Sequence, residues 1–291
     1  MPELPEVEIT ARLLDRAVAG AEVESALAPG VNVLKSFAPP LSQLSGRRIE
    51  RVRRRGKHFV IDCDGRLSLL IHLMSAGRLQ LYGKRAGPRE RTSRLLLRLL
   101  DGDGDSAAGG SQRELRLREF GSKQAAWAKL LPSDAVEQDP ALATLGPEAW
   151  PDPPELGPLL DGARPLNALL RDQRTIAGIG RSWADEILWR AMLSPFKRGG
   201  DLDAGELEAL RVAVVSVLGD ALAHYERVLT LPIPDKLPLP LEVHAHEGQP
   251  CPRCGTTLAA VHFDEHVIAY CPSCQTGGRT LKDRRLSRLL K

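Results

Sequence analysis

Apolar positions recur at steps of three and four residues in the first segment of the chain, which predicts a helix over 5–19. Val7, Ala11 and Leu14 share its apolar face, and Pro5 suits a first helical turn. Similar patterns predict three later helices, at 164–173, 182–193 and about 203–229. The chain is therefore expected to be helical at its start and again in its second half.

Between about 22 and 130 the pattern changes to short apolar or alternating runs, which are typical of strands. Examples are RLSLLIHLM (66–74), SRLLLRLL (93–100) and ELRLREF (114–120). The tract DGDGDSAAGGS (101–111) is expected to be a hairpin loop because it contains only small and turn-forming residues. We expect a two-layer β-sandwich with the first helix packed against it.

Two proline-rich stretches divide the chain. Eight prolines occur between 131 and 165, which prevents long helices and indicates a connection between domains. A second stretch, LPIPDKLPLP (231–240), precedes a segment that contains four cysteines. The predicted boundaries are a β-sandwich domain at 1–130, a linker at 131–163, a helical domain at 164–240 and a cysteine-containing module at 241–291.

Composition places the 291-residue chain among globular proteins, because 43% hydrophobic and 26% charged residues allow a sizeable core. No stretch approaches about 18 uninterrupted apolar residues, so no membrane partner is expected. The first residues, MPELPEVE, include acids and no apolar run, so no secretory signal is expected. The predicted location is the cytoplasm, in association with the nucleoid.

Basic residues are clustered, although the net charge is only +3. The stretch 46–58 contains seven Lys or Arg against one Glu, and 280–291 is similarly basic. Each stretch alone can be a solvated face, but several local patches on a near-neutral chain favour a phosphate track. The pattern indicates nucleic acid as the partner. A third group consists of Arg113, Arg116, Arg118, Lys123 and Lys129.

Four of the five cysteines form two CxxC pairs, Cys251 with Cys254 and Cys271 with Cys274, separated by sixteen residues. In a reducing compartment this spacing favours one tetrahedral Zn²⁺ site over two disulfides or a redox dithiol. Four thiolates leave no open coordination position, so the zinc is expected to be structural.

The start of the chain carries a candidate nucleophile. Removal of Met1 would leave Pro2 as a secondary amine, and an α-amino group titrates near pH 7.7–8.0, so a useful fraction is neutral at about pH 7. Such an amine can attack a sugar C1′ and form a Schiff base, and Glu3 is placed to protonate the opening sugar. The interpretation requires the freed nitrogen to lie where a deoxyribose can reach it.

PELPEVE at the start, Lys57 in a basic hairpin, AGIG between two helices and the CxxC-x16-CxxC pattern occur here in one order. Together they resemble the formamidopyrimidine-DNA glycosylase/endonuclease VIII family over nearly the whole chain, and the start is more similar to the formamidopyrimidine branch. The resemblance implies an α+β fold. An N-terminal β-sandwich with a packed N-terminal helix would precede a helix-two-turn-helix domain and a zinc-finger hairpin.

The resemblance also implies roles for single residues. Pro2 would be the Schiff-base nucleophile, Glu3 the proton donor, and Lys57 the lysine that contacts a phosphate beside the lesion and assists elimination. The remaining residues would contact DNA. They are Met74, Arg118 and Phe120, which would fill the space left by an everted nucleotide, Arg164, Gly178, Gly180 and Arg181 of the helix-two-turn-helix element, and His266 of the zinc hairpin.

The chain departs from the family pattern at four places. Arg181 replaces an asparagine, and His266 replaces an arginine tied to the final elimination, so δ-elimination stays open. A family histidine is missing near 92–94. The proline-rich LTLPIPDKLPLP occupies the region of the Gly/Thr-rich loop that covers a flipped base, so the resemblance does not define the lesion.

The most consistent interpretation is a monomeric base-excision-repair DNA glycosylase with abasic-site lyase activity. Its partner would be double-stranded DNA that contains a damaged base, for example an oxidised one, or an abasic site. The alternatives are a non-catalytic damage-recognition or architectural protein with the same clamp, an abasic-site lyase with little base excision, and a zinc-ribbon transcription or RNA factor. The last does not account for the Pro2–Glu3 start.

Overall fold

The computed structural model describes residues 2–86, 90–100, 112–121, 124–263 and 266–281. The chain divides into two compact units: the first consists of Met1–Ala143 and His224–Pro238, and the second of Thr144–Ala223 and Leu239–Lys291. None of the described helices combines the length and the apolar character needed to cross a bilayer. The predicted loop 101–111, Lys123 and residues 282–291 lie outside the described residues.

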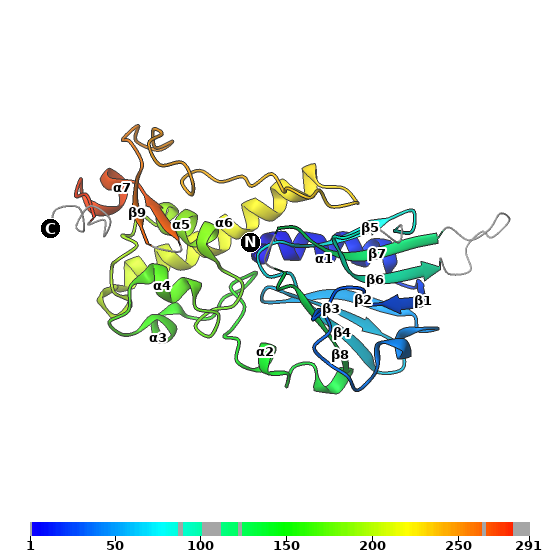
Figure 1. The fold of residues 1–291 in the computed structure, drawn as a ribbon. Coiled ribbons are helices and arrows are strands. Elements are labelled where there is room, and N and C mark those ends of the chain that lie inside the picture. Colours follow the sequence, from blue (N-terminus) through cyan, green and yellow to red (C-terminus); the bar gives the residue numbers. More distant parts are fainter. Residues whose placement is uncertain (1, 87–89, 101–111, 122–123, 264–265, 282–291) are drawn as a thin grey trace. The chain divides into compact units, whose positions relative to one another are not determined.

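The first unit is a two-layer β-sandwich with an N-terminal helix, as Figure 1 shows. The described residues form one sheet in the order β1-β6-β7-β5 and another in the order β2-β3-β4-β8, with antiparallel pairing throughout. The strands are β1 (Glu22–Leu27), β2 (Ile49–Arg55), β3 (His58–Cys63), β4 (Leu67–His72), β5 (Gly77–Tyr82), β6 (Ser93–Leu100), β7 (Gln112–Glu119) and β8 (Trp127–Pro132).

Helix α1 (Leu4–Val18) packs against β2, and its apolar face enters the core between the sheets. Val7 and Leu14, predicted on this face, are fully buried beside Phe59 and Leu117. The alternation of the strands explains the layers, because every second side chain points inward. Leu115 and Leu117 of β7 are buried apolar residues, whereas Arg116 and Arg118 lie on its other face.

Many basic side chains of this unit are paired with acids. In the stretch 46–58, Arg53 Nε lies 2.8 Å from Asp62 Oδ2, and Arg54 Nε lies 2.7 Å from Glu8 Oε2. These acids neutralise arginines that were predicted to bind phosphates. Local composition therefore overestimates the positive charge that is available to DNA. Similar pairs in the third basic group are Arg116–Glu114 and Lys129–Asp139, each at 2.7 Å.

The second unit is mainly helical and ends in a small hairpin. Its elements are α3 (Leu156–Leu160), α4 (Leu166–Arg171), α5 (Arg181–Arg190), most of α6 (Ala204–Val228), β9 (Ala259–His262), β10 (Val267–Tyr270) and α7 (Pro272–Thr276). The proline-rich stretch 131–165 contains only short helices, α3 and α2 (Pro140–Ala143) of the first unit, as the missing N–H groups predict. The α+β class is confirmed.

Candidate active site, DNA-contacting residues and zinc centre

The start of α1 is a closed network of buried polar groups. Glu3 is the N-cap and is only 2% exposed; together with Glu6 it forms a capping box in which Glu6 Oε2 accepts from the Glu3 backbone N–H at 2.8 Å. The hydroxyl of Tyr225, which follows 219 residues later, donates to Glu6 Oε1 at 2.8 Å. Burial and the neighbouring Glu6 carboxylate raise the pKa of Tyr225, so this hydroxyl stays a donor.

Pro2 is a buried residue, which differs from the accessible nitrogen that the sequence interpretation requires. In the sequence Met1 precedes Pro2, so before any removal of Met1 the Pro2 nitrogen is an uncharged tertiary amide. Such a group has no N–H and can be buried without losing a hydrogen bond to water. After removal of Met1 the same position would hold a secondary amine.

Lys57 lies in the two-residue turn between β2 and β3. Arg55 pairs with His58 across this hairpin, and Gly56 has φ of +56°, as the first central position of a type II′ turn requires. The Lys57 side chain is not splayed into solvent, since the residue is only 7% exposed. The tight turn therefore fixes the lysine at the end of the sheet.

Beside this turn, the rings of His58, His72 and Trp127 lie together in adjacent strands; His72 stacks on Trp127, and His58 is tilted against both. The ring centroids of His58 and His72 are 4.5 Å apart, and those of His72 and Trp127 are 5.8 Å apart. Burial lowers the pKa of His58 to about 4 and that of His72 to about 3, so both are neutral at physiological pH. The neutral His72 Nδ1 accepts the backbone N–H of Met74, which has φ of +51°, at 3.0 Å.

Met74, Phe120 and Arg118 lie at one end of β5 and β7, so the structure brings these three predicted residues together. The Met74 turn is joined to Phe120 by a hydrogen bond from the Phe120 N–H to the Ala76 carbonyl at 3.3 Å. The Arg118 guanidinium lies 4.8 Å from the centre of the Phe120 ring. Met74 and Phe120 are half-buried.

In the second unit, the turn before α5 is organised by one glutamine. Gln173 donates to the Ile179 carbonyl at 2.7 Å and accepts the Gly178 N–H at 3.0 Å. Gly178 has φ of +103°, which a residue with a side chain rarely adopts. Gly180 is the N-cap of α5, and Arg181 begins the helix with an exposed side chain. This helix start is suited to a phosphate.

Arg164 and His266 line one cavity of about 650 Å³ in the second unit. His266 stacks on Phe263 with ring centroids 4.6 Å apart, and Arg164 Nη1 lies 2.9 Å from Asp172 Oδ2. The structure thus places His266 and Arg164, both predicted to contact DNA, at the same cavity.

The carboxylates of Asp185 and Glu186 join α5 to the segment before the zinc hairpin. Glu186 accepts the backbone N–H groups of residues 242, 243 and 244 at 3.1, 2.9 and 2.8 Å. Asp185 Oδ2 lies 2.7 Å from His244 Nδ1 and accepts the Ala269 N–H at 3.0 Å. Burial raises the pKa of Asp185 to about 6.

The four cysteines of the two CxxC pairs meet at the base of the β9–β10 hairpin, with all four sulfurs within 4.8 Å of one another. Sulfur atoms about 2.3 Å from a common tetrahedral metal have this spacing. The Trp189 Nε1–H donates to Cys251 Sγ at 3.4 Å, an outer contact that orients a thiolate. The donor set and geometry fit one Zn²⁺ ion, which confirms the cofactor prediction.

Three family models match the chain: the formamidopyrimidine-DNA glycosylase N-terminal domain over residues 1–121, the H2TH domain of the same enzyme over 158–231, and the zinc finger found in FPG and IleRS over 248–277. The formamidopyrimidine-DNA glycosylase of Geobacter sulfurreducens is 34% identical, with 94% of this chain and 100% of the relative covered. The chain belongs to the formamidopyrimidine-DNA glycosylase family. The family identified from the sequence is therefore confirmed, and with it an enzyme class of DNA glycosylases with abasic-site lyase activity.

Other members of the family extend this likeness. The Thermus thermophilus formamidopyrimidine-DNA glycosylase is 33% identical, with 96% of this chain and 100% of the relative covered. An uncharacterized formamidopyrimidine-DNA glycosylase-like protein of Mycobacterium tuberculosis is 42% identical, with 52% of this chain and 98% of the relative covered. The Lactococcus lactis Fpg in complex with oxidized-pyrimidine DNA has the same fold, with a TM-score of 0.79, 24% identity, and 94% and 100% of the two chains covered.

Two contacts of the site were not predicted from the sequence. Tyr225 donates to Glu6, which forms the capping box with the predicted Glu3, and His72 accepts from the backbone of the predicted Met74. No local motif marks Tyr225, because it continues the apolar face of a long helix. His72 stands in a strand pattern in which an isolated histidine has no distinguishing neighbour.

Proposed function

We propose that this glycosylase forms its Schiff base through Pro2, after removal of Met1. The position of residue 2 directly before the Glu3–Glu6 capping box supports this assignment. Because the box and the Tyr225 hydroxyl fix the first turn of α1, a nucleophile at residue 2 would be held in one orientation. This network is the observation that carries the proposal.

In the proposed reaction, the Pro2 nitrogen attacks C1′ of the damaged nucleotide while Glu3 protonates the opening sugar oxygen. The base leaves with the electrons of the glycosidic bond, and an iminium ion forms at C1′. The iminium acidifies the C2′ proton, and its removal breaks the bond between C3′ and the phosphate oxygen. Lys57, fixed in its tight turn, would contact the adjacent phosphate during this β-elimination.

Double-stranded DNA with a damaged base or an abasic site is the proposed partner of a monomeric protein in the cytoplasm. Met74 and Phe120 would fill the gap left by the everted nucleotide, and Arg118 would contact the orphaned base. Arg164, Arg181, His266 and the glycine turn at 178–180 would hold backbone phosphates. The Phe263 ring, which stacks on His266, would hold this imidazole in one orientation.

An incision assay tests this function. Duplexes with 8-oxoguanine, formamidopyrimidine, an oxidised pyrimidine or an abasic site are incubated with protein whose N-terminus has been verified as Pro2. Incision of at least one base lesion together with the abasic duplex supports the proposal. Cleavage of the abasic duplex alone would indicate a lyase with little base excision, and binding without cleavage a recognition protein.

A further inference from the structure

The proline-rich segment 231–238 lies against the polar face of the sheet that contains β5 and β7. Ile233 is 2% exposed, and its carbonyl accepts a hydrogen bond from the Gln80 side chain. Gln80 Nε2 also donates to Asp235 Oδ1 at 2.9 Å, and Arg78 Nε donates to the Asp235 carbonyl at 2.9 Å. The segment is therefore fixed to the first unit by contacts from two neighbouring positions on one strand face.

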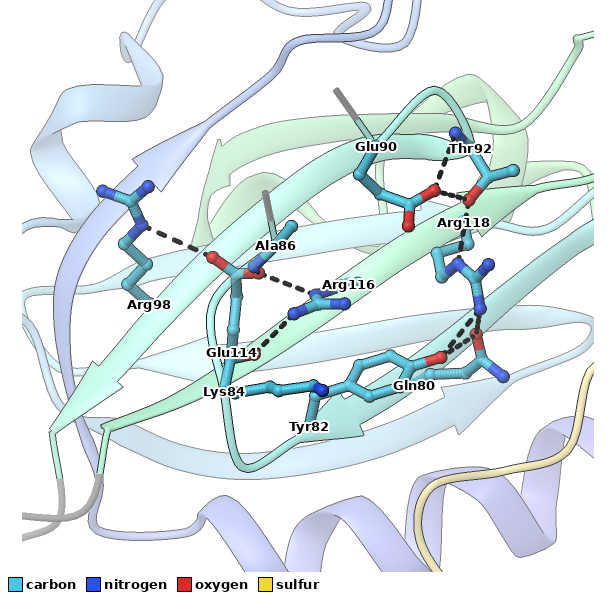
Figure 2. Close-up of polar contacts among 10 residues, drawn as sticks. All are labelled: Gln80, Tyr82, Lys84, Ala86, Glu90, Thr92, Arg98, Glu114, Arg116 and Arg118. Carbon is cyan, nitrogen blue, oxygen red and sulfur yellow. Dashed lines mark hydrogen bonds and ion pairs between the residues drawn. The ribbon is translucent and has the colours of Figure 1, made fainter. Parts of the chain in front are cut away.

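Asp235 also contacts the predicted base-contacting arginine, because Arg118 Nη1 lies 3.2 Å from Asp235 Oδ1. The same Nη1 donates to the Tyr82 hydroxyl at 2.8 Å and to Gln80 Oε1 at 3.2 Å. Arg118 Nε donates to Thr92 Oγ1 at 2.9 Å. Figure 2 shows the guanidinium between the Gln80 and Thr92 side chains.

Asp235 is the only carboxylate that directly contacts Arg118 among the described residues; the other acceptors are neutral oxygens. Thr92 is in turn held by Glu90, so the Nε side of the guanidinium has a fixed partner as well. Arg118 Nη2 makes no hydrogen bond with the part of the chain that the structure describes. Nε and Nη1 of the guanidinium are thus anchored, and the two N–H groups of Nη2 remain for an outside acceptor.

We propose that Asp235 is a positioning residue that orients Arg118 and thereby sets the preference for the base opposite the lesion. This inference rests on the proposed function of Arg118. A planar guanidinium in a fixed orientation favours a base with two neighbouring acceptors. The pairing edge of cytosine offers O2 and N3, whereas that of adenine offers one ring acceptor next to an amino donor. The segment 231–238 would hold Asp235 rigidly in place beside Arg118.

The test measures binding of a duplex that contains a tetrahydrofuran abasic analogue opposite either cytosine or adenine. Fluorescence anisotropy gives the ratio of the two Kd values for the wild type and for Asp235→Ala, Asp235→Asn, Arg118→Ala and Lys236→Ala. Both Asp235→Ala and Asp235→Asn remove the charge, but only Asp235→Asn keeps an oxygen acceptor. Comparison of the two variants therefore separates the effect of the hydrogen bond from that of the charge. Lys236, next in the chain, is the matched control.

We expect the wild type to prefer cytosine and Asp235→Ala to lose about threefold to tenfold of this preference, the factor typical of one hydrogen bond. Lys236→Ala should keep the ratio, and Asp235→Asn should lose less of it than Asp235→Ala, because the amide keeps the oxygen acceptor but not the charge. An unchanged ratio in Asp235→Ala, an equal loss in Asp235→Asn, or a wild type without preference overturns the inference.

Persistence of the cytosine preference in Arg118→Ala would overturn both the inference and the base-contacting assignment of Arg118. The proposed chemistry is tested separately, because incision of an abasic duplex reports on Pro2 and does not require discrimination between opposite bases. A failure of catalysis and a failure of the Asp235 proposal are therefore distinguished.

Discussion

Two helices of this protein carry pairs of buried carboxylates: Glu3 and Glu6 at the start of α1, and Asp185 and Glu186 in the middle of α5. The two pairs differ in the groups with which they form hydrogen bonds. In α5, Asp185 and Glu186 accept backbone N–H groups from residues 242–244 and from Ala269, which are distant in sequence. At the start of α1, Glu6 bonds the Glu3 N–H and a tyrosine hydroxyl. The α5 pair accepts only from distant segments in these contacts, whereas the α1 pair closes a capping box beside residue 2 and accepts one distant side chain, Tyr225. Burial alone therefore does not distinguish Glu3, the acid proposed for catalysis, from the buried acids of α5.

The largest difference between the α1 pair and the α5 pair should appear in the rate of base excision. Glu3→Gln should lower the rate of base excision by about 10²–10⁴, because the amide cannot protonate the opening sugar. Single-turnover incision of a lesion duplex measures this rate, and thermal unfolding measures stability in parallel. Similar losses of rate in Glu3→Gln and Glu186→Gln, at a temperature at which both are folded, would contradict the distinction.

The second largest effect should appear in DNA affinity and concerns the zinc hairpin, which Asp185 and Glu186 join to α5. Removal of zinc by a chelator, or Cys254→Ser, should lower DNA affinity by at least about tenfold, because a structural zinc site supplies folding free energy. Zinc content and DNA affinity are measured on the same samples. Retention of affinity in a protein shown to be zinc-free would exclude a role of the hairpin in DNA binding.

Glu186→Gln should cost about 2–4 kcal/mol in the free energy of unfolding, because the amide nitrogen would face backbone donors that the carboxylate now accepts. Urea unfolding gives this free energy. Glu208→Gln is a suitable control, since Glu208 is an exposed acid paired with Arg211 on the surface of α6. Equal small losses in the two variants would show that Glu186 does not join the segments.

The smallest effect is a pH dependence. Burial raises the pKa of Asp185 to about 6, above the value of about 3.9 in an unfolded chain. The folded state therefore favours the protonated form, and stability from this group is present below about pH 4 and is lost as the pH rises to about 6. Asp185→Asn should flatten the decline between these values in urea unfolding. A slope equal to that of the wild type would contradict the assignment.

Local patterns predicted much of the fold and of the site. Cys251, Cys254, Cys271 and Cys274 were predicted as ligands because the spacing of the two pairs fixes their geometry, whatever the rest of the chain does. Helix α1 follows from its apolar face and proline, and the strand predicted at 114–120 corresponds to β7. These features depend on residues close together in sequence.

Contacts between distant residues were beyond the sequence. Tyr225 reaches Glu6 across 219 residues, and Asp235 reaches Arg118 across 117, so no spacing rule connects them. The basic patches were overestimated for the same reason, since Asp139 neutralises Lys129 from a separate segment. Burial of Pro2 depends on packing around the whole first turn, which a motif does not encode.

The central claim is that the nitrogen of residue 2 is the nucleophile. Protein with a verified Pro2 terminus is incubated with an abasic duplex and borohydride, and the covalent adduct is digested and mapped by mass spectrometry. The account predicts a DNA adduct on the N-terminal peptide at Pro2, and none in protein that retains Met1. An adduct on Lys57, or no adduct with the processed protein, would contradict it.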